Sequence, residues 1–125
     1  MTNKTKGQLE AEISIALTQF EKDHLGRGPK EARTFIIQDM VLIRLKGVLT
    51  PTEEKLSKED DGAQLIKQIR MRLIESSRKL LEKLIYEKTG AKVISVHTDI
   101  STRSGEQIFV LVLDVNLETE LKNRL

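Results

Sequence analysis

Apolar residues recur at helical spacing near the start of the chain. Leu9, Ile13, Leu17 and Phe20 lie three or four positions apart, which predicts an amphipathic helix beginning near Leu9. The segment GRGP at positions 26–29 follows, and it combines a glycine suited to a helix C-terminus with a proline that cannot continue a helix. The chain is therefore expected to turn there.

Two extended runs come next, from Glu31 to Gln38 and from Met40 to Val48. Both are rich in β-forming residues, and the connection between them is too short for anything but an antiparallel hairpin. Thr50, Pro51 and Glu53 then match the start of a short helix, with the threonine as N-cap and the glutamate placed to complete a capping box.

The second half repeats this order of elements. Apolar periodicity predicts one long helix from Ala63 to Lys88, which Thr89 and Gly90 end. Extended runs from Lys92 to Ile100 and from Gln107 to Val115 follow, joined by a turn in which Ser104 and Gly105 supply a positive φ. A short terminal helix is predicted from the four-residue spacing of Leu117, Leu121 and Leu125.

A unit of helix, glycine and two strands thus occurs twice. The most economical arrangement is one α+β domain over residues 1–125, in which two antiparallel hairpins form a four-stranded sheet and the helices pack on one face.

Some of these elements are apolar on more sides than one sheet face can cover. Strand 107–115 is apolar on both faces, and the apolar residues of helix 63–88 spread over about half of its circumference. In strand 92–100, by contrast, Ile94, Val96 and Ile100 are expected on one face and Ser95, His97 and Asp99 on the other. Either the short helices cover the excess surface, or the chain forms a homodimer or a larger homo-oligomer, which we favour.

Composition narrows the function classes. The 125 residues carry 21 Lys and Arg against 19 Asp and Glu, and only three Phe, one Tyr and no Trp, which argues against a nucleic-acid partner. There is no cysteine, so disulfides and thiolate metal sites are excluded. No run approaches the roughly 18 apolar residues of a membrane span, and no leader pattern is visible, so a cytoplasmic protein is expected.

His97 and Asp99 are the first candidates for chemistry, because alternate strand residues project from the same face and these two side chains could share a proton or a metal. No third ligand and no helical metal motif accompanies them, so a surface hydrogen-bonded pair is the favoured interpretation and no metal site or cofactor is predicted. No nucleophile motif is visible either, which favours a protein that is not an enzyme.

Arg70 falls inside the apolar arc of helix 63–88. A guanidinium there is either buried against an anion or carboxylate, or it lies at the edge of the arc and extends to water, which is the commoner outcome and the one we favour.

Three blocks of sequence give the chain a strong resemblance to the MpsC family, the sodium-translocating membrane-potential-generating system proteins. They are KGQLE (6–10) with HLGRGPK (24–30), DMVLIRLKGVLTPTE (39–53), and SVHTDISTRSGEQ (95–107). The resemblance covers nearly the whole chain. It implies a link to sodium-dependent membrane energetics and an integral membrane partner, but it carries no ligand residues or reaction to these positions.

Two functions therefore stand as hypotheses. The first is a non-enzymatic accessory or regulatory module that assembles with itself and with a membrane protein. The second is a domain that binds a small anionic ligand, or acts on it, at the outer sheet face. The residues considered for that ligand are His97, Asp99, Arg103, Arg44, Arg33 and Arg70.

Overall fold

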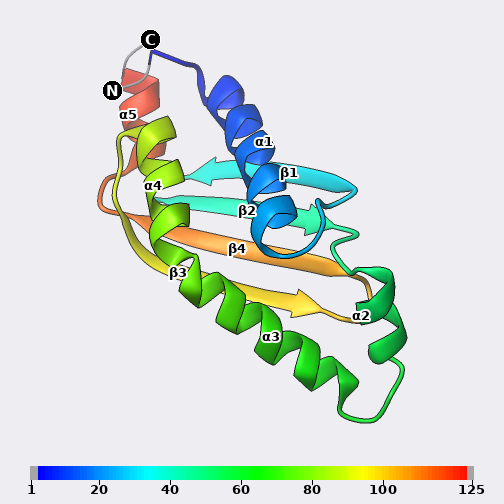
Figure 1. The fold of residues 1–125 in the computed structure, drawn as a ribbon. Helices are drawn as coiled ribbons and strands as arrows, with labels where there is room; N and C mark the ends of the chain where they lie inside the picture. The colour runs from blue at the N-terminus through cyan, green and yellow to red at the C-terminus, as the bar shows by residue number, and fades with distance from the viewer. Residues whose placement is uncertain (1–2, 124–125) are drawn as a thin grey trace.

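The computed structural model describes residues 3–123 and has five helices and four strands within that range (Figure 1). In chain order they are α1 Lys6–His24, β1 Glu31–Ile37, β2 Met40–Lys46, α2 Pro51–Leu56, α3 Gly62–Ser76, α4 Arg78–Thr89, β3 Val93–Ser101, β4 Glu106–Leu113 and α5 Leu117–Asn123.

The strands form one antiparallel sheet in the order β1-β2-β4-β3. The two predicted hairpins, β1–β2 and β3–β4, meet through β2 and β4 at the centre, where Ile43 lies opposite Phe109. The predicted α+β class and the four-stranded antiparallel sheet are thus confirmed.

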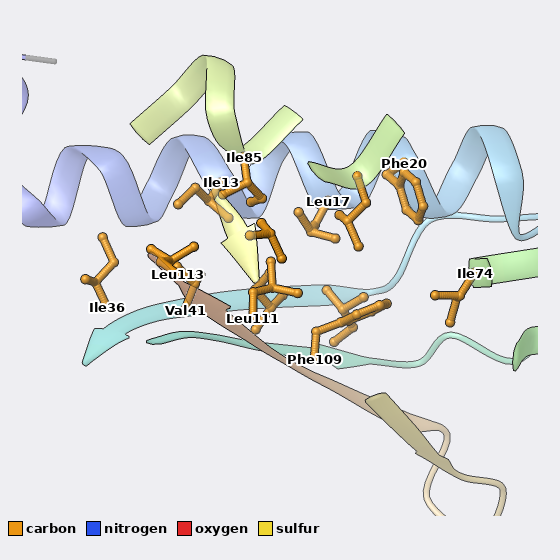
Figure 2. Packing of buried hydrophobic residues seen from close by; sticks show 14 of the residues in the cluster. Ile13, Leu17, Phe20, Ile36, Val41, Ile74, Ile85, Phe109, Leu111 and Leu113 are labelled. Atoms are coloured by element: carbon orange, nitrogen blue, oxygen red, sulfur yellow. The ribbon is translucent and has the colours of Figure 1, made fainter. Parts of the chain in front are cut away.

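Helices α1 and α4 lie over the same face of the sheet, and their apolar sides meet the inward residues of the strands (Figures 1 and 2). Ile13 and Leu17 of α1 and Ile85 of α4 pack here with Phe109 and Leu111 of β4, and all five side chains are buried. We call this the inner face. Burial of each large apolar side chain contributes about 1.5–3 kcal/mol, so this layer supplies most of the stability.

Capping residues and glycines define the helix ends and the β3–β4 turn. Thr50 and Glu53 form the predicted capping box at α2, and Thr5 and Gln8 form another at α1. Gly90 ends α4 with a φ of 75°, and Gly105 supplies the positive φ of the β3–β4 turn at 72°.

Two side chains bind backbone N–H groups in the edge strand β1 and in the turn that follows it. The carboxylate of Glu10 in α1 accepts a hydrogen bond from the backbone N–H of Ile36 at 2.8 Å, and Glu118 in α5 accepts one from Gln38 at 3.0 Å. These donors are therefore occupied by the chain itself.

The predicted single helix from Ala63 to Lys88 is wrong, because the segment is divided into α3 and α4 at Ser77. Ser77 has φ −104° and ψ 7°, and its N–H is shared between the carbonyls of Leu73 and Ile74. The hydroxyl of Ser76 also bonds the carbonyl of Leu73 at 3.0 Å. Serine hydroxyls compete for helix carbonyls in this way, so Ser76 weakens the helix at the point where the backbone of Ser77 leaves helical geometry.

The predicted faces of strand 92–100 also need correction. A register shift between Val93 and Ser95 places Ile94 in a bulge, where its side chain is exposed rather than part of the inner layer. The remaining residues keep the predicted alternation, with His97 and Asp99 on the outer side. The bulge adds one residue to β3 and so breaks the simple two-residue period.

Other strand ends differ by one or two residues: β1 ends before Gln38, which has a φ of 56°, β2 ends at Lys46 and β4 at Leu113. The terminal helix is confirmed over Leu117–Asn123, and the predicted position Leu125 lies outside the described residues.

The close packing at the start of α3 is expected to favour glycine at position 62. A Cβ at this position would lie 1.8 Å from the backbone oxygen of Leu56, so the α2–α3 connection would have to move. We expect Gly62→Ala to lower the free energy of unfolding by about 1–3 kcal/mol in urea denaturation. The matched control is Gly7→Ala in α1, where nothing lies within 4 Å, and it should raise stability by about 0.5–1 kcal/mol. Equal effects of the two substitutions would contradict this account.

Candidate functional site

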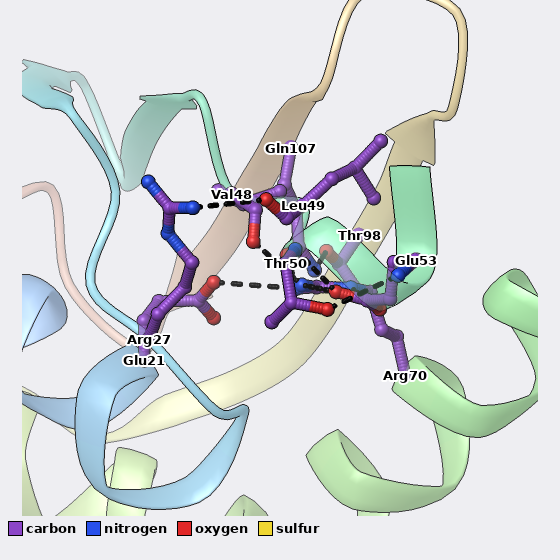
Figure 3. A network of polar contacts seen from close by, with 9 residues as sticks. All are labelled: Glu21, Arg27, Val48, Leu49, Thr50, Glu53, Arg70, Thr98 and Gln107. Carbon is purple, nitrogen blue, oxygen red and sulfur yellow. Dashed lines mark hydrogen bonds and ion pairs between the residues drawn. The ribbon is translucent and has the colours of Figure 1, made fainter. Parts of the chain in front are cut away.

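The most concentrated polar cluster surrounds Arg70, whose side chain is 2% exposed (Figure 3). Its guanidinium donates two hydrogen bonds to the carboxylate of Glu53 in α2, from Nε to Oε2 at 2.9 Å and from Nη2 to Oε1 at 2.8 Å. Parallel bonds of this kind are among the strongest that side chains make in proteins. The favoured expectation that Arg70 reaches water is therefore wrong, and its alternative, a buried guanidinium with a carboxylate partner, is what the structure has.

All of the N–H groups of Arg70 find an acceptor within the chain. Nη2 also donates to the carbonyl of Val48 at 2.8 Å, while Nη1 donates to Gln107 Oε1 at 3.2 Å and to Glu21 Oε1 at 3.5 Å. Gln107 in turn donates to Thr98 at 3.2 Å. Because its donors are already used internally, Arg70 acts here as a structural connector, and it lies on the opposite side of the sheet from the other candidate ligand residues.

The cluster holds two carboxylates for one guanidinium, and they differ in charge state. Burial alone would raise the pKa of Glu53, but hydrogen bonds from Arg70 and from Thr50 outweigh it and hold this pKa below the ordinary value. Burial raises the pKa of Glu21 to about 7, with the attraction of Arg70 opposing the rise and the negative charge of Glu53 adding to it. Glu21 Oε2 is buried without a hydrogen-bond partner. Glu21 is thus the carboxyl group that takes up a proton near neutrality.

Sequence reasoning singled out Arg70 but missed its partners Glu21 and Gln107. A signal for Glu21 was present, because it follows Leu17 by four positions and so continues the apolar stripe of α1. A carboxylate on one buried helix face, such as Glu21, can form an ion pair with a guanidinium on another, such as Arg70. Gln107 carried no comparable signal.

The face of the sheet opposite α1 and α4 carries the remaining candidates, and we call it the outer sheet face. Its side chains form four rows across the strands in the order β1, β2, β4, β3. From first to fourth the rows are Ile37, Met40, Val112 and Ser95; Phe35, Leu42, Val110 and His97; Arg33, Arg44, Ile108 and Asp99; and Glu31, Lys46, Glu106 and Ser101.

The first two rows are mostly apolar and remain partly or fully exposed in the isolated chain. Phe35 and Ile37 are exposed, and Met40, Leu42, Val110 and Val112 are half-buried. The third and fourth rows are mostly charged. The short helices therefore leave this apolar surface open, although covering it was one of the two sequence-based explanations.

The structure brings some of the candidate ligand residues together and separates others. Arg33 and Arg44 lie directly opposite one another and, with Lys46, line a groove of about 300 Å³. Each already has an acidic partner, Glu31 at 3.1 Å from Arg33 and Glu106 beside Arg44 at 2.5 Å.

His97 and Asp99 share the outer face of β3 but have different partners. The ring of His97 bonds the hydroxyl of Ser95 at 3.1 Å. Asp99 accepts the N–H of Ile100 at 2.9 Å and lies 3.4 Å from Lys67 of α3. The expected hydrogen-bonded pair is replaced by these separate contacts.

Arg103 lies in the β3–β4 turn. It lines a second, open groove of about 460 Å³ that runs between this turn and the start of α3, and Lys67 and Asp99 line the same groove. The candidate ligand residues are therefore divided between two grooves and the buried cluster, and His97 lines neither groove.

A second exposed apolar surface lies on α3. Leu65, Ile69 and Leu73 occur at four-residue intervals and all three are exposed, with Leu65 at 46% and Ile69 at 52%. On a helical wheel they lie beside the buried Ile66, Arg70 and Ile74. We call these three residues the α3 stripe.

Among residues 3–123, the structure shows no group of three or more His, Cys, Asp or Glu side chains placed to hold a metal ion. Within the same residues, no helix combines the length and the apolar character needed to cross a membrane.

Comparison with known proteins gives a consistent result. The family model described as "Na+-translocating membrane potential-generating system (MpsC)" matches residues 5–115. "Uncharacterized protein YbcI" from Bacillus subtilis (strain 168) is 45% identical over 119 residues, covering 95% of this chain and 96% of the relative. "Uncharacterized protein YrhF" from the same organism is 23% identical over 110 residues, covering 87% of this chain and 90% of the relative. No solved structure matches the chain.

Removal of the Arg70 guanidinium is expected to be strongly destabilising. Arg70→Ala leaves the buried Glu21 and the half-buried Glu53 without their cation, and breaking a buried ion pair in this way costs about 3–5 kcal/mol. Urea denaturation of Arg70→Ala should show this loss. The control Arg72→Ala changes an exposed arginine on the same helix and should stay within about 0.5 kcal/mol of the wild type. A loss no greater for Arg70→Ala than for Arg72→Ala would contradict the proposed network.

Glu21 is expected to make stability depend on pH. Its pKa rises from 4.5 in the unfolded chain to about 7 in the fold, so the folded state binds a proton that the unfolded state has lost between these values. The free energy of unfolding should therefore fall as the pH rises from about 4.5 to 7, by roughly 1–3 kcal/mol from this group.

The matching variant is Glu21→Gln, which cannot lose a proton. We expect its stability relative to the wild type to increase steadily between pH 5 and pH 8 in urea denaturation, because only the wild type develops a second buried negative charge. A difference between the two proteins that does not change with pH would show that Glu21 has no raised pKa.

Proposed function

The chain belongs to the MpsC family, and from this membership together with the α3 stripe we propose that it is a non-enzymatic accessory module of a sodium-dependent membrane system. It acts at the cytoplasmic surface, where the α3 stripe docks an amphipathic helical segment of an integral membrane subunit. The observation that carries the proposal is the exposure of Leu65, Ile69 and Leu73 on one side of a helix.

The spacing of the stripe supports a helical partner. Residues four apart on a helix form a continuous ridge, which suits the apolar face of a second helix laid alongside it. Leu80, which is also exposed, follows Leu73 after seven residues and lies in the next helix, α4. Because the break at Ser77 separates Leu80 from the α3 stripe, the continuous surface available to a partner helix is the stripe itself, about two turns long.

Charge beside the stripe favours a protein segment with acidic residues. Arg72 of α3 lies beside the stripe and is exposed, as is Lys79 of α4, while Glu75 is an acidic exception on the same turns. An amphipathic segment with carboxylates beside its apolar face would complement this arrangement, and electrostatic complementarity would add specificity to the apolar contact.

The family description supports the membrane location of that partner. It names a sodium-translocating, membrane-potential-generating system. Transport across a membrane requires spanning segments, so another subunit would provide the pathway and this chain would bind to it.

A complementation experiment tests the proposal in cells. Cells that lack the native copy receive the wild type, the stripe variant Leu65→Ser/Ile69→Ser, or the control Ile15→Ser, which changes an exposed isoleucine on α1 that is 71% exposed. With sodium present, a voltage-sensitive dye should report a normal membrane potential in cells with the wild type or the control. Cells with the stripe variant should show the same reduced membrane potential as cells that carry no copy. Full complementation by the stripe variant, or a deletion without effect, would overturn the proposal.

Sedimentation with membranes separates a protein partner from lipid. Purified wild type should sediment with native membranes that have been washed free of peripheral proteins, and the stripe variant should bind at least tenfold less. Trypsin treatment of the membranes should abolish binding, and protein-free anionic vesicles should not bind the wild type. Equal binding to the vesicles would replace the protein partner by a lipid surface.

A further inference from the structure

We propose that the outer sheet face binds a second copy of this chain, giving a two-fold dimer whose axis runs parallel to the strands between β2 and β4. In this arrangement, β1 of one copy lies over β3 of the other, and β2 lies over β4. The surface is separate from the α3 stripe, so this inference goes beyond the proposed docking on a membrane subunit.

The apolar rows supply the attraction. At the centre of the face, Leu42 and Val110 are neighbours across β2 and β4, and Met40 and Val112 are neighbours in the next row. The proposed axis passes between these strands, so Leu42 of one copy meets Val110 of the other. Sheets packed face to face interdigitate their side chains in this way, with their strands within about 30° of each other.

The distribution of residues selects this axis among the possible ones. A two-fold axis that lies in the interface across the strands would reverse the order of the rows, and the charged third row would then cover the apolar second row. Arg33 and Arg44 would lie against Phe35 and Leu42, where their charges would lose water without gaining a partner. An axis parallel to the strands keeps every row on its own counterpart. Of the two arginines, only Arg44 then lies against an apolar side chain, Ile108 of the second copy, and it keeps its partner Glu106 within its own chain.

The charges are complementary about the same axis. In the third row the cations Arg33 and Arg44 lie on β1 and β2, and Asp99 lies on β3; in the fourth row Lys46 lies on β2 and Glu106 on β4. Rotation about the proposed axis places Arg33 over Asp99 of the second copy. It also places Lys46 over Glu106 of the second copy.

The ion pairs already present within one chain are compatible with this dimer. Glu31, the one acid on the cationic half, holds Arg33 at 3.1 Å, and Lys67 approaches Asp99 from α3 at 3.4 Å. All four side chains keep substantial exposure, so each can share a second partner across the interface. The dimer would then have ion pairs within and between the copies in the third and fourth rows, beside the apolar contact of the first two rows.

The test begins with the molecular mass in solution. Multi-angle light scattering on wild type at about 100 µM should give twice the chain mass of 14.2 kDa. Leu42→Glu and Val110→Glu each place a carboxylate in the apolar centre and should give monomers that keep the wild-type circular dichroism spectrum. The control Ile69→Glu changes the α3 stripe and should remain a dimer.

A charge-reversal mixture tests the axis itself. Arg33→Glu and Asp99→Arg should each weaken the dimer at least about tenfold in sedimentation equilibrium at low salt, because like charges then face each other. Mixing the two variants should restore a dimer of near wild-type affinity, since each contact in the mixed pair joins opposite charges. Within one chain these positions are three strand spacings apart, about 14 Å, so the rescue cannot arise inside a single copy.

Several outcomes would overturn the inference. A wild-type monomer at about 100 µM would remove the dimer. A dimer that survives Leu42→Glu and is lost in Ile69→Glu would move self-association to the α3 stripe. Failure of the mixed variants to restore affinity would reject the proposed axis. A wild-type monomer or a failed rescue leaves the membrane sedimentation experiment unaffected, because its stripe variant does not change the outer sheet face. A dimer lost only in Ile69→Glu would count against the docking role of the α3 stripe as well.

Discussion

The guanidinium of Arg70 ties helices α1, α2 and α3 to one another and to the sheet. Its bonds join α3 to α2 through Glu53, to α1 through Glu21, to β4 through Gln107, and to the loop after β2 through Val48. Glu53 also completes the capping box of α2, so one carboxylate both begins a helix and ties it to another. A buried ion pair often adds little net stability compared with an apolar replacement, but its geometry is demanding. The cluster therefore serves mainly to fix the conformation of the segment 48–53, which connects β2 to α2.

Placing the helices on the inner face has a consequence for the rest of the molecule. The apolar residues of β4 that point inward are covered by α1 and α4, whereas those that point outward are covered by no helix and stay half-exposed. The break at Ser77 lets α3 leave the direction of α4, as Figure 1 shows, and one side of α3 stays uncovered. Two different exposed surfaces result, one a sheet face and the other a helix ridge, and they are suited to different kinds of neighbour.

Much of the fold was predictable because its signals are local. The capping box at Thr50, the glycine at position 90 and the alternation in the strands each act over a few residues, and they set the element order and the hairpins. The break at Ser77 and the bulge at Ile94 were missed, because each depends on how serine hydroxyls or neighbouring strands compete for backbone groups. Family membership was predictable from the three sequence blocks. The buried cluster was only half visible, since a pattern shows that Arg70 is on an apolar arc but not which distant carboxylate meets it.

The occupied edges of the sheet limit the form that any self-assembly can take. The carboxylate of Glu10 holds the N–H of Ile36 on β1, and that of Glu118 holds the N–H of Gln38 just after the strand. On β3 the bulge at Ile94 interrupts the other edge. Free edges are where sheets recruit further strands, and proteins commonly block them with charges and bulges. Interruptions at both margins make the addition of a further strand less favourable, so self-association is directed to the faces of the sheet and into closed, countable complexes.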